Sequence, residues 1–217
     1  MPDKSGPLPK SVWIGLAMMF GFFGLAGLLA FLSQPKLHPI PVIGPVADFT
    51  LTNEGGAVTT LANLTNHVWV ADIIFTRCAG PCPRMTQQMK SVQDALAADD
   101  NARLVTLTTD PDNDTPEVLA RYAKHYGADT NRWTFLTGTK AEIAGLAAGG
   151  LKLSSMAVKP TEQKDAADLF IHTTIFVVVD KHAQLRVSFE SGGDGVDWTN
   201  DVEPRLLETV NQLEQEP

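Results

Sequence analysis

The chain contains two cysteines, and both lie in one short segment, "TRCAGPCPRM", at residues 76–85. Cys78 and Cys82 are four positions apart, and a proline stands directly before and directly after the second cysteine. The mostly apolar, β-branched stretch at 68–75 predicts a strand that is buried on both faces. Pro83 favours the first turn of a helix. The pattern therefore predicts two sulfurs on one side of a turn between a buried strand and a helix.

Thiols at the amino end of a helix are expected to ionise near neutral pH, because the helix dipole stabilises the thiolate. Thiolate is both a nucleophile and a metal ligand, so three uses are open. A structural disulfide here would close a loop of a few residues and would constrain the unfolded chain little. A redox pair more typically shows C-x-x-C. The extra residue widens the pair, which suits two sulfurs on one soft ion, Cu(I) or zinc.

Two thiolates usually need a third protein ligand, and His172 is the strongest candidate among the five histidines. It stands at the start of the apolar strand pattern "LFIHTTIFVVVD", after an irregular polar stretch at 150–168. A histidine in such a strand is ordinarily a core residue. In a thioredoxin arrangement, however, the loop that enters this strand lies beside the cysteine turn. The remaining histidines are expected at ordinary solvated positions: His38, His67, His125 and His182.

The predicted elements alternate between strands and helices and then end in a hairpin and a helix. This order indicates an α/β domain with a central mixed sheet, and it matches a thioredoxin-like fold with an N-terminal extension and an inserted segment. The predicted elements after the cysteine turn are a helix at 85–99, a strand at 103–109, a helix closed by Gly127, a strand at 133–138, a short helix, a hairpin at 169–190 that turns near 180–183, and a helix at about 200–215.

Residues 12–32 form a run of 21 residues without a charge, about the length that a helix needs to cross a bilayer core. The run is longer than the apolar part of a signal peptide and no convincing cleavage site follows it, so we expect an uncleaved single-pass anchor. Lys4 and Lys10 precede the run and Lys36 follows it, a slight bias that places the N-terminus in the cytoplasm. The predicted location is a bacterial inner membrane, with the remaining chain in the periplasm.

The predicted organisation has four parts: a cytoplasmic N-terminus at 1–11, the anchor at 12–32, a tether at 33–46 and the α/β domain at 47–217. The tether contains four prolines and no helical pattern, which predicts an extended linker. The formal net charge of −8 argues against nucleic acid or an anionic membrane surface as the main partner.

Three segments taken together closely resemble the Sco/SenC proteins, which are membrane-anchored copper chaperones with a thioredoxin-like fold. The segments are "VWVADIIFTRCAGPCPRM", "LVTLTTDPDNDTPEVLARYAKHYG" and "DLFIHTTIFVVVD". The resemblance covers nearly the whole chain after the tether. It implies copper, as Cu(I), Cu(II) or both, with Cys78, Cys82 and His172 as ligands. It also puts Asp110 and Asp112 beside the site, where they either tune it or serve only as turn and cap residues.

The resemblance implies a partner as well, subunit II of cytochrome c oxidase, whose two-copper centre these proteins help to build. Other copper chaperones or thiol reductants are further candidate partners. We expect a copper-binding assembly factor without turnover, and therefore not an enzyme. The alternative is a thiol–disulfide oxidoreductase that uses Cys78 and Cys82 to reduce a client on the outer side. Loss of His172 should separate the two, because it should abolish Cu(II) binding and leave the dithiol chemistry largely intact.

Overall fold

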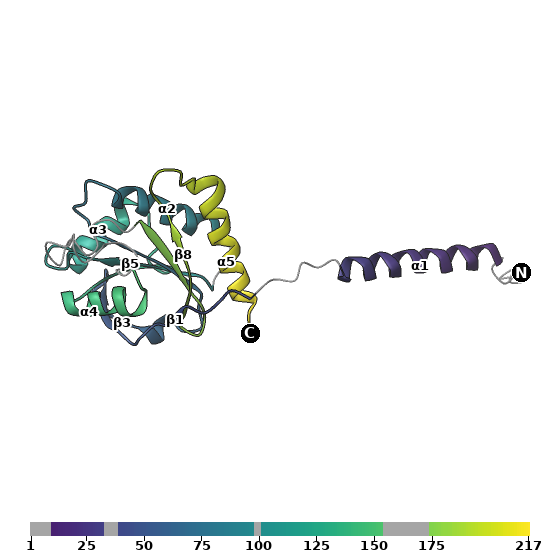
Figure 1. The fold of residues 1–217 in the computed structure, drawn as a ribbon, viewed down its shortest axis with the longest axis horizontal. Coiled ribbons are helices and arrows are strands. Elements are labelled where there is room, and N and C mark those ends of the chain that lie inside the picture. Colours follow the sequence, from purple (N-terminus) through teal and green to yellow (C-terminus); the bar gives the residue numbers. More distant parts are fainter. Residues whose placement is uncertain (1–9, 33–38, 98–100, 154–173) are drawn as a thin grey trace, which may run out of the picture. The chain divides into compact units, whose positions relative to one another are not determined.

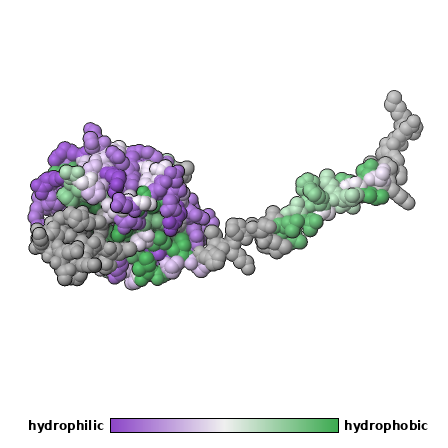
Figure 2. All heavy atoms as spheres, turned by 45° about the horizontal axis from the view of Figure 1, so that its top comes forward, coloured by the Kyte–Doolittle hydropathy of each residue, from purple (hydrophilic) through white to green (hydrophobic). Residues whose placement is uncertain are grey.

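The computed structural model describes residues 10–32, 39–97, 101–153 and 174–217, and the chain divides into two compact units between Pro39 and Ile40. The first unit contains helix α1, Lys10–Leu32. Its residues 11–29 are long and apolar enough to cross a membrane. Most large apolar side chains between Val12 and Leu29 are exposed, and Figure 2 shows hydrophobic residues along the helix, whereas the visible face of the second unit is mostly hydrophilic. The predicted apolar helix is thus confirmed, and it begins two residues earlier than predicted.

The second unit is built on one eight-stranded sheet with the order β1-β8-β7-β4-β5-β6-β2-β3. Strands β4, β5 and β6 are parallel, while β7 is antiparallel to β4 and forms a hairpin with β8. The predicted mixed sheet is confirmed. Its strands are β1 (Gly44–Pro45), β2 (Thr50–Asn53), β3 (Val58–Thr60), β4 (Trp69–Ile74), β5 (Arg103–Thr108), β6 (Trp133–Thr137), β7 (Ile175–Val179) and β8 (Gln184–Glu190).

Helices cover both faces of the sheet, as Figure 1 shows, so the central strands bury side chains in both directions. In β4, Val70 and Ile74 pack into one core with α2, α3 and α5, while Ala71 and Ile73 pack into a second core with α4. The continuous apolar run of this strand follows from that double coverage. The helical elements of the domain are Leu61–Asn63, α2 (Cys82–Ala95), α3 (Pro116–His125), α4 (Lys140–Ala144), Gly145–Gly150, Trp198–Val202 and α5 (Glu203–Gln215).

Local turn chemistry agrees with the sequence at two boundaries. Gly127 follows α3 with a φ of +68°, the left-handed conformation that glycine adopts without strain. In the β7–β8 hairpin, the amide of Ala183 donates to the carbonyl of Asp180 at 3.0 Å, which closes the predicted turn. The part of this predicted hairpin before Thr174 lies outside the described residues.

The end of the segment assigned to the tether packs against the domain. The amide of Ile43 donates to the Leu185 carbonyl at 2.8 Å, and strand β1 pairs with β8. Val46 is buried. Sequence patterns did not reveal this strand because it is two residues long, includes a proline and is stabilised by a partner 140 positions away in the chain.

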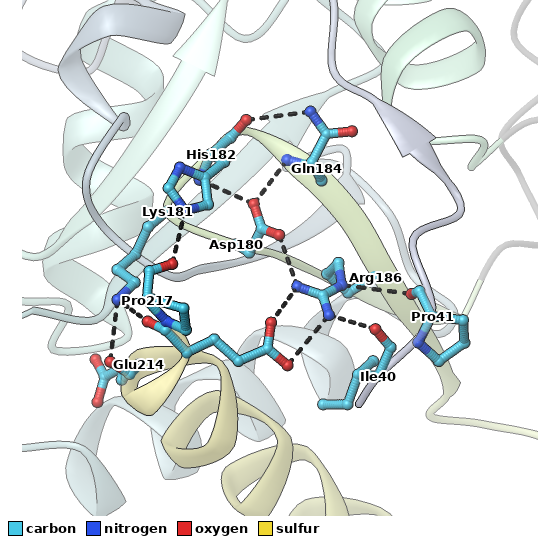
Figure 3. A network of polar contacts seen from close by, with 10 residues as sticks. Ile40, Pro41, Asp180, Lys181, His182, Gln184, Arg186, Glu214 and Pro217 are labelled. Atoms are coloured by element: carbon cyan, nitrogen blue, oxygen red, sulfur yellow. Dashed lines mark hydrogen bonds and ion pairs between the residues drawn. The ribbon is translucent and has the colours of Figure 1, made fainter. Parts of the chain in front are cut away.

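A buried arginine holds this entry segment in place (Figure 3). The guanidinium of Arg186 donates to the carboxylates of Asp180 and Glu216, each at 2.7 Å, and to the carbonyls of Ile40 and Pro41. Arg186 and Asp180 are each 6% exposed. We call these five residues the arginine clasp. The guanidinium group of an arginine has five N–H donors fixed in one plane. Arg186 can therefore join three segments of the chain: residues 40–41, the β7–β8 hairpin and the C-terminal end at Glu216.

The arginine clasp and the cysteine turn lie at opposite ends of the sheet. Val179, next to Asp180, pairs with Trp69 at the amino end of β4. The cysteine turn follows Ile74 at the carboxyl end of the same strand. A six-residue strand spans about 17 Å. The chain therefore enters the domain at the end away from its two cysteines.

We predict that Arg186→Met strongly destabilises the domain. The substitution leaves the Asp180 carboxylate buried without its cation, which typically costs about 3–5 kcal/mol. Denaturant unfolding of the full chain in detergent measures the loss. Arg121→Met is the matched control, because Arg121 is exposed on α3 and its expected loss is below about 1 kcal/mol. Equal stabilities of the two variants would contradict the importance of the arginine clasp.

Candidate metal and redox site at the cysteine turn

The two cysteines lie where β4 ends and α2 begins. Cys78 sits in the connecting turn and is half-buried, whereas Cys82 is the first residue of α2 and is 5% exposed. Both are free thiols. The Cys78 amide donates to the Phe75 carbonyl at 3.1 Å, and the Gly80 amide donates to the Cys78 Sγ at 3.4 Å. The more exposed sulfur therefore belongs to Cys78, an assignment that the sequence left open.

Burial, and after it the hydrogen bond with Cys78, raise the pKa of the Cys82 thiol to about 12. The prediction that the helix dipole would make this thiol a thiolate near neutral pH is therefore wrong for Cys82. Loss of hydration disfavours the charged form more than the dipole favours it. A metal that binds here must displace the Cys82 proton, so binding releases a proton at neutral pH.

A buried carboxylate, Asp114, holds the chain just before the cysteines. Asp114 is fully buried and accepts hydrogen bonds from the Thr76 amide at 3.0 Å and the Thr76 hydroxyl at 2.5 Å. It also accepts from the Thr108 hydroxyl at 2.5 Å and from Asn113 Nδ2 at 2.7 Å. Thr108 ends the neighbouring strand β5. Asp114 thus joins the carboxyl ends of two parallel strands beneath the turn.

Asp114 was not singled out in the sequence as a site residue, and it does not cap helix α3. The cap of α3 is Thr115, whose side chain accepts from the Val118 amide. The sequence does contain a signal for the role of Asp114 as a shared acceptor, because Thr76 and Thr108 are polar residues at the ends of two apolar strands. Parallel neighbours end at the same edge of a sheet, so their terminal polar side chains need a shared partner.

The two aspartates predicted beside the site differ from each other. Asp110 accepts from Arg77 Nε at 3.1 Å and from its Nη2, so it contacts the residue next to Cys78. Asp112 is 75% exposed and forms an ion pair with Lys140 at the start of α4. Asp110 therefore contacts the cysteine turn through Arg77, whereas Asp112 contacts α4 through Lys140.

His172 lies outside the described residues, as does the stretch 154–173 that contains it. In the described ranges, no three histidine, cysteine, aspartate or glutamate side chains are grouped so that they could hold a metal ion. The proposed ligand set thus has two described members, Cys78 and Cys82. The position of the third remains a prediction.

The described chain resumes at Thr174, beside Gly192. The Thr174 hydroxyl donates to the Gly192 carbonyl at 3.2 Å, and the Ser191 amide donates to the Thr174 carbonyl at 2.5 Å. A Cβ atom at Gly192 would lie 2.1 Å from the Nη2 of Arg84. Gly192 therefore packs against a side chain that stands two residues after Cys82, and Thr174 lies beside both.

A second buried carboxyl, Asp72, lies in β4 between Val70 and Ile74, on the face that packs against α2. One of its oxygens accepts from the Thr106 hydroxyl at 2.6 Å, and the other has no hydrogen-bond partner among the described residues. Burial raises the pKa of Asp72 from 3.8 to about 7. The charge of Asp72 in turn contributes to the raised pKa of Cys82.

We predict that Asp72→Asn removes a pH dependence of stability. Between about pH 4 and pH 7 the folded protein keeps the Asp72 proton and the unfolded chain loses it, so the wild type loses stability as pH rises through this window. The loss is about 1.4 kcal/mol per pH unit, and above the folded-state pKa it stops growing. Urea unfolding of both proteins at pH 5, 6, 7 and 8 measures the difference. Parallel curves for the two proteins would contradict this assignment.

Comparisons with known proteins agree on one family. The family model described as SCO1/SenC matches residues 44–206. The SCO1 protein homolog of Bacillus subtilis (strain 168) is 36% identical over 141 residues, which is 64% of this chain and 70% of that protein. The mitochondrial SCO1 homolog of Mus musculus is 29% identical over 159 residues, 66% of this chain and 53% of that protein.

Solved structures with the same fold include members of this family. One study identifies a disulfide switch in BsSco, a member of the Sco family of cytochrome c oxidase assembly proteins; that structure matches with a TM-score of 0.66 and 26% identity, over 83% of this chain and all of that one. The structure of Bradyrhizobium japonicum ScoI with copper bound matches with a TM-score of 0.58 over 79% of this chain and 99% of that one. At 21% identity the second likeness concerns the fold alone.

Proposed function

The chain belongs to the SCO1/SenC family, and we propose that it is a membrane-anchored copper carrier that prepares the two-copper centre of cytochrome c oxidase subunit II. Cys78, Cys82 and His172 are the proposed copper ligands. Copper is the cargo of this protein rather than a resident cofactor. The family match and the description of BsSco as a member of the Sco family of cytochrome c oxidase assembly proteins support the assignment.

The observation that carries the proposal is the pairing of two free thiols at one turn. The hydrogen bond with Cys78 that helps to raise the Cys82 pKa brings the two side chains together without a disulfide. Soft thiolate ligands favour Cu(I) and also bind Cu(II) when an imidazole completes the set. With two thiolates and a neutral imidazole, the site has a net charge of −1 with Cu(I) and of zero with Cu(II).

The path of the described chain supports His172 as the third ligand. Two extended residues span at most about 7 Å, so the Cα of His172 cannot be further than that from the Cα of Thr174. Thr174 contacts Gly192, which packs against Arg84 in the first turn of α2. The contact of this part of the chain with the side chain of Arg84, two residues after Cys82, is the observation that supports His172 as a ligand.

A three-ligand site with one half-buried sulfur suits the transfer of an ion. An incoming ligand of the acceptor can bind copper before a carrier ligand leaves, whereas sites with four protein ligands are typically structural. Cys78 is the more exposed ligand, so transfer should begin on its side. Because Cys82 is buried, it should be the last sulfur to release the ion.

The proposed location follows from α1. Its exposed apolar side chains would be poorly solvated in water, so we propose that α1 crosses a bacterial inner membrane once. Lys4 and Lys10 then mark the cytoplasmic side and the copper domain lies in the periplasm. A carrier held in the membrane plane shares that plane with an acceptor in the respiratory oxidase.

We predict that His172→Ala lowers Cu(II) affinity by more than the roughly 10–100-fold that loss of a group supporting a ligand causes. Anaerobic titration of the reduced full chain, followed by the thiolate-to-Cu(II) charge-transfer band, measures this loss. His125→Ala is the control, because His125 is exposed at the end of α3. Wild-type copper binding by the His172 variant would contradict the proposed ligand set.

A second candidate function is reduction of a client disulfide, which the unequal burial of the two cysteines favours. The Cys78 thiolate would attack one sulfur of the client disulfide and release the other as a thiol after protonation. Deprotonated Cys82 would then attack Cys78 and release the second client thiol. The client gains two electrons, Cys78 and Cys82 become a disulfide, and a thiol reductant must reset the pair.

For this second function we predict that Cys82→Ser accumulates a mixed disulfide through Cys78. The resolving thiol is absent in the variant, so the reaction with an oxidised peptide that contains one disulfide stops halfway. Mass spectrometry of the non-reduced protein detects the adduct. Cys78→Ser should form far less adduct, because its remaining thiol is buried and has a raised pKa. Equal trapping by both variants would contradict the order of attack.

A further inference from the structure

Asp114 lies at the junction from which the cysteine turn starts. Its carboxylate accepts four hydrogen bonds, from the Thr76 amide, the Thr76 and Thr108 hydroxyls and Asn113 Nδ2. Thr76 follows β4 by two residues and Thr108 ends β5. Since β4 and β5 are parallel and pair Ile74 with Thr108, both strand ends meet above this carboxylate. Asp114 itself is anchored by its amide, which donates to the Asp110 carbonyl at 2.8 Å.

The two cysteines depend on different supports. Cys82 belongs to α2, where the helix and the core of the domain hold it. Cys78 belongs to the turn that begins at Phe75, and the Cys78 amide closes this turn on the Phe75 carbonyl. Within that turn, Asp114 grips both the backbone and the side chain of Thr76. The position of the Cys78 sulfur relative to Cys82 therefore depends on the contact between Asp114 and Thr76.

A carboxylate is suited to this position because it accepts hydrogen bonds and donates none. Four donors converge on its two oxygens in a fully buried place. An asparagine NH2 group in place of Oδ2 would face the Thr76 amide and the Thr108 hydroxyl, and in place of Oδ1 it would face the Thr76 hydroxyl and Asn113 Nδ2. In either orientation, one hydrogen bond that Thr76 donates to residue 114 is lost. The exchange therefore removes hydrogen bonds on the side of the cysteines without removing volume from the core.

We propose that Asp114 is a positioning residue for the copper and thiol chemistry: through Thr76 it sets where the Cys78 sulfur stands relative to Cys82. This inference rests on the proposed copper-carrier function. It does not require Asp114 to touch copper. Hydrogen-bond partners that orient a ligand typically change metal affinity 10–100-fold when they are removed.

The test compares variants on the two sides of the carboxylate in the full chain in detergent. Asp114→Asn should lower Cu(II) affinity about 10–100-fold and shift the thiolate-to-Cu(II) band. Thr76→Val removes one contact on the cysteine side and should reproduce part of this loss. Thr108→Val is the control on the β5 side: it removes the hydrogen bond from Thr108 to the same carboxylate and the one that Thr108 accepts from the Asp110 amide at 3.0 Å, and it keeps both hydrogen bonds between Thr76 and Asp114. It should therefore destabilise the fold, leave the affinity within about threefold of the wild type and leave the band unshifted.

A double-variant cycle separates positioning from general destabilisation. If Asp114 acts through Thr76, the variant with both Asp114→Asn and Thr76→Val should lose little more affinity than Asp114→Asn alone. Unfolding curves identify the temperature range in which each variant is folded. If Asp114→Asn does not fold, the Cu(II) affinities of Thr76→Val and Thr108→Val can still be compared, and a larger loss in Thr76→Val supports the positioning role.

Two results would overturn the inference. One is wild-type copper affinity and an unshifted band in folded Asp114→Asn or, failing that variant, in Thr76→Val. The other is an equal loss in Thr108→Val, which would mean that any damage below the turn weakens binding. Failure of the proposed function looks different, because the unmodified chain itself would then show no Cu(II) band.

Discussion

The parallel pairing of β4 with β5 is the constraint on which the rest of the site depends. It brings the ends of two buried strands to one edge of the sheet, and there the chain leaves β4 for the cysteine turn and leaves β5 for the loop that carries Asp114. A carboxylate can bind both ends only because the register pairs Ile74 with Thr108. A slip of one residue would turn every side chain of one strand to the opposite core, and the polar ends would lose their shared partner.

Three buried polar residues, Asp114, Arg186 and Asp72, differ in how many hydrogen-bond partners surround them. Asp114 has four donors, and Arg186 has carboxylates and carbonyls around it, so both satisfy their hydrogen-bonding capacity. Asp72 has one donor for two oxygens within the described part of the chain, and its pKa rises to about 7 as a result of burial. Asp72 illustrates the physical rule: a buried carboxyl that has too few hydrogen-bond donors tends to keep its proton.

The contacts that hold the entry segment and the two cysteine thiols lie in different parts of the domain. The arginine clasp binds the entry segment at one end of the sheet, and the thiols stand at the other end. Because strands are stiff when their ladders are complete, the separation of about 17 Å along β4 is set by the sheet itself. The two cysteines and residues 40–41 therefore lie at different ends of the sheet.

The sequence by itself determined the order of strands and helices from β4 onward, the apolar helix at the N-terminus and the family, because each of these depends on local periodicity, turn residues or a run of neighbouring positions. It identified Cys78 and Cys82 as the candidate ligand and redox pair for the same reason. Only the tertiary structure decided which sulfur is exposed, that burial of Cys82 overrides the helix dipole, and that Asp114 rather than Asp112 supports the turn. It also decided that residues 40–46 join the domain, through Arg186. These outcomes depend on burial and on partners distant in the chain, and local sequence patterns carry no record of either.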